Sequence, residues 1–158
     1  MDTEGKDVIR KARLAFAPFP KPAPCTRHAD LEDSGFNEML LSTPREELSL
    51  HQIGTVAWGP VPSLTAEALA HFMPRLIELA VSGQNDPDGG PFFCLFVNWF
   101  HQGPDQSRFR LFGPEQREAM AEVFAFLLTR FAEQLGQEGW LAEAEQGLAA
   151  WAAAPRQE

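Results

Sequence analysis

The sequence contains no apolar run long enough to cross a membrane. Its most apolar stretch, PFFCLFVNWFHQ at residues 91–102, is shorter than the roughly 18 residues that a membrane helix needs. The first residues, MDTEGKD, are acidic, whereas a secretory signal starts with basic residues and continues with an apolar stretch. We therefore expect a soluble, cytoplasmic protein that has no membrane partner.

Cysteine is also scarce, because the 158 residues include only Cys25 and Cys94. Two cysteines can form at most one disulfide, and a domain of this length folds without one. We expect both thiols to be free. No nucleotide-binding, catalytic or metal-binding motif of high specificity is present either, so the sequence points to no particular activity.

Basic residues are outnumbered: 13 Lys and Arg stand against 22 Asp and Glu, which gives a net charge of −9. The imbalance is greatest at residues 113–158, which hold eight acidic and three basic residues. Such a surface repels nucleic-acid phosphates and anionic lipids, and it attracts a basic partner protein. Solubility alone would explain the same charge, so a basic partner is a hypothesis, whereas a nucleic-acid partner is disfavoured.

The apolar residues that are present recur at helical spacing. The strongest pattern covers residues 112–135, where the spacing of three and four places apolar side chains on one helix face; they are Met120, Val123, Phe124, Leu127, Leu128, Phe131 and Leu135. Pro114 suits a first helical turn, and Gly136 suits the end of a helix. We expect the other elements to pack around this helix.

Weaker patterns predict the remaining helices, over residues 3–15, 26–36, 43–50, 65–81 and 138–153. The fold class predicted is all-α, a compact single-domain bundle of five or six helices. Residues 1–24 would form an N-terminal helix and a proline-rich arm, and residues 25–158 the helical domain. The segment from Phe92 is ambiguous: we predict a buried helix, and the alternative is a short hairpin over residues 92–112, which would make the fold α+β.

The arm is defined by prolines at alternate positions from Pro18 to Pro24. Proline fixes φ and removes a backbone donor, so this segment should be extended. It could be a ligand for an aromatic groove of another protein, or a strap across its own molecule. The neighbouring Phe16 and Phe19 favour the strap, because they supply apolar contacts.

Two groups of residues have side chains that could carry chemistry. If residues 26–36 are helical, Cys25, His28 and Glu32 share one face and could bind zinc. A structural zinc site usually has four ligands, and no second spaced pair is present, so we predict no cofactor. In a helical segment from Phe92, Cys94 and His101 share a face and could support a thiol enzyme. A buried cysteine and a histidine at a helix end explain the same residues.

Two further sites are suggested for binding. Pro74 lies inside the predicted helix 65–81 and should disturb it; a small-molecule cavity there would be lined by Trp58, Phe72, Pro74 and Trp99. Phe126 lies off the main stripe of its helix, so it either has a second cover or is exposed as a contact for a partner. The acidic residues Glu138, Glu143 and Glu145 of the last predicted helix are further candidates for contact with a partner.

Several short motifs occur together: Cys25-x-x-His28 followed by acidic residues, Trp58 before a Gly/Pro turn, Pro74 in a helix, and Phe112-x-x-Glu115-Gln116 at the start of a long helix. Over about residues 25–135 the chain resembles an uncharacterised bacterial family of small proteins, a domain of unknown function. This resemblance implies a bacterial cytoplasmic domain and transfers no catalytic residue. At Thr26 and Arg27 the chain departs from the family pattern, which weakens a metal site.

These observations favour a non-enzymatic, acidic protein-binding module, such as an adaptor or an immunity-type protein that neutralises a basic partner. The alternatives are a metal- or thiol-dependent enzyme that uses Cys25 and His28, or Cys94 and His101, and a small-molecule binder at Pro74.

Overall fold

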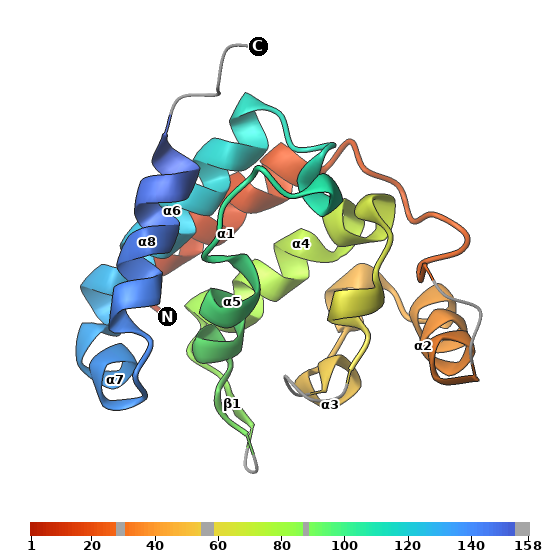
Figure 1. Cartoon of the computed structure of the whole chain (residues 1–158), viewed down its shortest axis with the longest axis horizontal. Helices are drawn as coiled ribbons and strands as arrows, with labels where there is room; N and C mark the ends of the chain where they lie inside the picture. Colours follow the sequence, from red (N-terminus) through yellow and green to blue (C-terminus); the bar gives the residue numbers. More distant parts are fainter. Residues whose placement is uncertain (28–30, 55–58, 87–88, 154–158) are drawn as a thin grey trace.

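A computed structural model of the chain describes residues 1–27, 31–54, 59–86 and 89–153 (Figure 1). The α-helices are α1 (Thr3–Phe16), α2 (Leu31–Ser42), α3 (Leu50–Ile53), α4 (Ala66–Val81), α5 (Phe92–Phe100), α6 (Pro114–Arg130), α7 (Ala132–Gln137) and α8 (Leu141–Ala152). Short 3-10 helices lie between them, namely η1 (Arg45–Glu47), η2 (Val61–Ser63) and η3 (Ser107–Phe109). The only strands within the described ranges are β1 (Asn85–Asp86) and β2 (Gly90–Pro91), an antiparallel pair.

The all-α class is therefore confirmed, and the α+β alternative is wrong. Phe92–Phe100 form helix α5, and Arg108 and Phe109 lie in η3 rather than in a strand. The described part has more α-helices than the five or six expected, partly because the predicted helix 112–135 is divided at Phe131. There the backbone leaves the helical conformation (φ −122°, ψ 22°), and the ring stacks on Phe93 with centroids 4.4 Å apart.

Helix α4, rather than the segment 112–135, is the most deeply buried element. Thirteen of its residues are buried, against seven in α6. Helix α6 packs between α8 and α1, and α1 packs against α4 (Figure 1). In the figure, α2 lies to the right of this group and α3 lies below α4. Buried side chains of α1, α4, α5, α6 and α8 belong to one hydrophobic core.

Aromatic side chains make up much of this core. The ring of Phe112 contacts three others, with ring centroids 5.0 to 5.9 Å apart: Phe16 of α1, Phe109 of η3 and Trp151 of α8. Trp151 is buried, and its indole Nε1 donates a hydrogen bond of 2.7 Å to the carbonyl oxygen of Phe100. Because a buried indole N–H needs an acceptor, this bond holds α8 against the end of α5.

The proline arm lies across its own molecule, as the strap interpretation expects. The Nζ of Lys21 donates hydrogen bonds to the carbonyl oxygens of Leu40, Leu41 and Thr43 at the end of α2. Beyond the prolines, Thr26 pairs with Leu64 in an antiparallel bridge. The arm thus joins α2 to the segment that leads into α4.

Two predicted helix starts are wrong. The second helix begins at Leu31 rather than near residue 26, because Cys25 and Thr26 are extended by their pairing with the segment before α4. The helix predicted over residues 43–50 does not start at Thr43, because the Thr43 hydroxyl donates to the carbonyl oxygen of Met39 in α2. Helix α3 starts later, after Ser49, and is capped by Ser49 and Gln52. In the described ranges, no helix is both long and apolar enough to span a membrane.

Candidate functional site

The surface of α7 and α8 is acidic and has no basic side chains. Residues 131–153 include Glu133, Glu138, Glu143 and Glu145 and contain no Lys, Arg or His. Glu133, Glu138 and Glu145 are exposed, and Glu143 is half-buried. None of the four forms an ion pair with a described residue. We use the name acidic face for the surface of residues 131–153 that carries them; Glu143 and Glu145, two residues apart on α8, point to different sides of that helix.

Elsewhere on the molecule, many carboxylates have a basic neighbour. Lys11 of α1 lies 3.1 Å from Glu118 and 2.5 Å from Glu122 of α6. Glu67 accepts a hydrogen bond of 2.7 Å from Arg110. The four glutamates of the acidic face, in contrast, form no such pair with a described residue, and Glu133, Glu138 and Glu145 are exposed to solvent.

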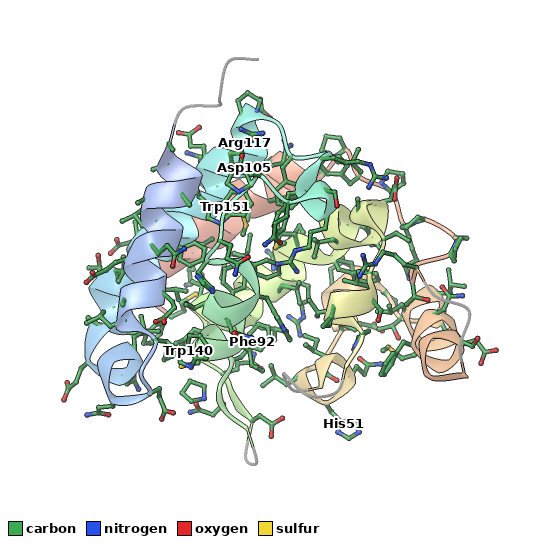
Figure 2. All side chains as sticks on the ribbon, in the orientation of Figure 1. His51, Phe92, Asp105, Arg117, Trp140 and Trp151 are labelled. Atoms are coloured by element: carbon green, nitrogen blue, oxygen red, sulfur yellow. The ribbon has the colours of Figure 1, made fainter. Side chains whose placement is uncertain are left out.

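Trp140 lies between α7 and α8, at the lower left in Figure 2. Its side chain is half-buried and packs against the core, as do the half-buried Leu141 and Leu148 of α8. The turn that carries Trp140 is held by a hydrogen bond of 2.8 Å from its amide to the carbonyl oxygen of Leu135. An aromatic side chain with remaining exposed surface thus lies next to Glu138 in the sequence, within the acidic face.

One oxygen of Glu143 has an unusual environment. Its Oε2 is buried and accepts no hydrogen bond from the described residues. Leaving a carboxylate oxygen out of water without a donor costs free energy, on the order of 1–3 kcal/mol or more. This oxygen is covered by the chain itself, so it is not open to a partner.

Phe126 is not part of an exposed contact surface. Its side chain is 4% exposed, because Phe131 packs edge-on against the ring and the Arg130 guanidinium lies 5.6 Å from its centroid. Phe131, at the break between α6 and α7, is the second residue that covers the Phe126 ring. The prediction of Phe126 as a partner contact is therefore wrong.

The aromatic residues predicted to line a pocket at Pro74 do not line the hollow found there. Phe72 is fully buried, Trp99 is 7% exposed and packs against Phe92 and Phe100, and Trp58 lies outside the described residues. Two residues along a helix turn the side chain by about 200°, so Phe72 and Pro74 face opposite sides. A hollow of about 350 Å³ does exist at Pro74, and it is lined by Arg13, Arg45, Glu46, Pro74, Arg75 and Glu78.

The proposed metal face does not form as expected, because Cys25 lies in an extended segment rather than on a helix. Its thiol is buried and donates to the carbonyl oxygen of Pro22 at 3.4 Å, and burial raises its pKa. His28 and the side chain of Glu32 lie outside the described residues. Among the residues that the structure describes, no three Cys, His, Asp or Glu side chains are grouped so as to hold a metal ion.

Cys94 and His101 lie on or next to α5, and both are near the last helices. Burial raises the pKa of the Cys94 thiol to about 11, and the negative charge of Glu138 acts in the same direction. The thiol is thus protonated at neutral pH, which makes it a weak nucleophile. The Nδ1 of His101 is 3.2 Å from Oε1 of Gln146, and no hydrogen bond in the described part of the chain connects it to Cys94.

Comparison of the chain with protein families, with curated proteins and with solved structures gave no match. The resemblance to a bacterial family therefore stays a prediction. Function has to be inferred from the geometry of the chain itself.

The charged lining of the hollow at Pro74 was not predicted from the sequence. Arg13, Arg45 and Arg75 are each about thirty residues apart, and no local motif connects them. Arg75, in a helix that is mostly apolar, is the one weak sequence signal.

Proposed function

We propose that the protein is a non-enzymatic binding module whose acidic face docks a basic segment of a partner protein. The observation that carries this proposal is the set of four glutamates in residues 131–153, none of which forms an ion pair with a described residue. Unpaired carboxylates repel one another, which costs the folded chain stability, so a partner that supplies positive charge would gain binding energy and association rate from them.

Trp140 gives the proposed interface a centre. Interfaces draw most of their binding energy from a few aromatic or arginine side chains that are surrounded by polar residues. Trp140 is half-buried and lies two residues from the exposed Glu138, so it would supply an aromatic side chain beside a carboxylate. The partner segment should therefore contain closely spaced basic residues.

A pair of matched charge-reversal variants tests the proposal. The variant E138K/E145K alters the acidic face, and E38K/E47K makes the same change in net charge at exposed acidic residues of α2 and η1. Proteins captured from cell lysate by the wild type should include a basic protein released by salt. Its affinity for E138K/E145K should fall by at least about tenfold, and its affinity for E38K/E47K much less.

Crosslinking of the captured complex locates the interface. A carbodiimide joins a carboxylate to a lysine amine without a spacer, so the expected crosslinks connect partner lysines to Glu133, Glu138 or Glu145. Equal affinity of the partner for wild type and E138K/E145K, or crosslinks confined to carboxylates elsewhere, would disprove the proposal.

A further inference from the structure

Three arginines from distant parts of the chain meet at one hollow. Arg13 lies near the end of α1, Arg45 begins η1, and Arg75 follows Pro74 in α4, and all three line the hollow of about 350 Å³. This volume is near the lower end of the range of about 300–1,000 Å³ that is typical of small-molecule pockets. A cationic hollow in a chain of net charge −9 requires an explanation.

Backbone carbonyls hold two of these arginines in place. The Nη1 of Arg45 donates a hydrogen bond of 3.0 Å to the carbonyl oxygen of His71, and the Nε of Arg75 donates one of 2.8 Å to that of Leu48. Their side chains are only 23% and 18% exposed. A carbonyl orients a guanidinium without neutralising its charge, so both groups are preorganised and remain cationic.

The acidic residues of the hollow compensate this charge only in part. Glu78 lies between two arginines, 2.8 Å from Arg13 and 3.1 Å from Arg75. Glu46 is 3.6 Å from Arg45 but 70% exposed, so its interaction is weakened by solvent. Three guanidinium groups thus face two carboxylates, which leaves a surplus of one positive charge, and Arg13 is itself 57% exposed. The Nη2 atoms of Arg45 and Arg75 donate no hydrogen bond to any residue that the structure describes.

We propose that this hollow binds the phosphate group of a small phosphorylated molecule. The surplus of positive charge attracts an anion, and guanidinium groups bind phosphate oxygens through paired N–H donors. The backbone carbonyls engage only Nη1 of Arg45 and Nε of Arg75, so further N–H groups of these two arginines are available as donors, beside those of Arg13. The hollow is larger than a phosphate ion requires, so it leaves room for a small organic substituent next to Pro74.

Titration of the isotope-labelled protein with inorganic phosphate, and separately with glycerol phosphate, tests this proposal. The Nε–H resonances of Arg13, Arg45 and Arg75 should shift with saturation at millimolar concentrations, and glycerol phosphate should bind more tightly than inorganic phosphate. Acetate and chloride at equal ionic strength should give no saturable shift. Tighter binding of acetate than of either phosphate probe would disprove the phosphate assignment.

Two pairs of variants connect the binding to the hollow. R13Q should weaken phosphate binding about tenfold, whereas R10Q, which removes an exposed arginine on the same helix with its own ion pair to Asp7, should leave it unchanged. E46Q should tighten binding severalfold, because it removes a competing negative charge, and E47Q on the same 3-10 helix should not.

E46Q keeps the test valid even if R13Q disturbs the fold, because Glu46 is largely exposed. The proposal would be overturned if the wild type showed no saturable shift, or if R10Q and R13Q weakened binding equally. Unchanged binding in E46Q would also overturn it.

Discussion

The burial of His71 connects a single side chain to the stability of the protein. Its imidazole is 9% exposed on α4, its Nδ1 is 2.9 Å from the carbonyl oxygen of Phe19, and its buried Nε2 has no partner among the described residues. Burial lowers the pKa of His71. The Phe19 carbonyl and Glu46 oppose this effect, and Arg45 and Lys21 reinforce it.

We therefore predict that His71 makes stability fall in mild acid. The folded protein holds the ring neutral, whereas the unfolded chain protonates it below about pH 6.5. The contribution of His71 is fully present above that pH. It decreases as the pH falls toward the lower pKa of the folded state, at up to about 1.4 kcal/mol per pH unit.

Chemical denaturation at several pH values checks this. The variant H71N keeps a donor near Nδ1 and removes the titrating group, so its free energy of unfolding should fall less between pH 7 and pH 5 than that of the wild type. His51 projects from α3 into solvent in Figure 2, and H51N controls for the loss of one imidazole. A wild type and H71N with parallel pH profiles would contradict the prediction.

The contact between α6 and α8 depends on a glycine. A Cβ atom at Gly147 of α8 would overlap the ring of Phe124 on α6, and Phe124 is fully buried. The glycine therefore allows the two helices to approach, and α8 carries both the acidic face and Trp151. Its position within a helix is otherwise unfavourable, by about 1 kcal/mol relative to alanine.

We predict that G147A lowers the free energy of unfolding by about 1–2 kcal/mol, because overpacking against Phe124 outweighs the gain in helix propensity. G136A is the matched control: no atom lies within 4 Å of a Cβ there, so alanine in α7 should stabilise the protein by about 0.5–1 kcal/mol. Thermal and urea unfolding of both variants measure these changes. Stabilisation by G147A would show that the two helices can separate without cost.

At the level of helices, local spacing was a good guide to where helices form and a poor guide to where they end. The expected helices 3–15 and 65–81 agree closely with α1 and α4, because amphipathic spacing and the Thr65 cap are local properties. The break at Phe131 depends on a ring from α5, which lies about forty residues away. No pattern within residues 112–135 contains that contact.

The molecule is held together partly by its N-terminal strap. Besides its three bonds to α2, the Nζ of Lys21 lies 5.7 Å from the ring centroid of Phe72 in α4. A cation at the end of a helix is also favoured by the helix dipole. Lys21 therefore connects the N-terminal arm, α2 and the buried helix α4.

We predict that K21M, which keeps the apolar stem and removes the ammonium group, lowers the free energy of unfolding by about 1.5–3 kcal/mol. Amide hydrogen exchange should accelerate most in the last turn of α2. The exposed Lys6 of α1 provides the control K6M, which should change neither quantity appreciably. Unchanged exchange in α2 of K21M would show that the strap does not stabilise that helix.

Charge is divided between two regions of the molecule. Unpaired carboxylates gather on α7 and α8, and arginines gather where α1, η1 and α4 meet. The first region could be predicted in part, since Glu138, Glu143 and Glu145 follow one another in the sequence. The second could not, since its arginines converge only through the packing of α1 and η1 on α4.

Composition and periodicity were sufficient for the all-α class, most helices and the acidic character of the last segment, because each depends on neighbouring residues. Packing between distant residues decided the burial of Phe126, the extended conformation of Cys25 and the charged lining at Pro74. The physical reason is that exposure and geometry of a side chain depend on what covers it. In this chain the cover comes from other elements: Phe131 over Phe126, the Leu64 segment beside Cys25, and α1 and η1 around Pro74.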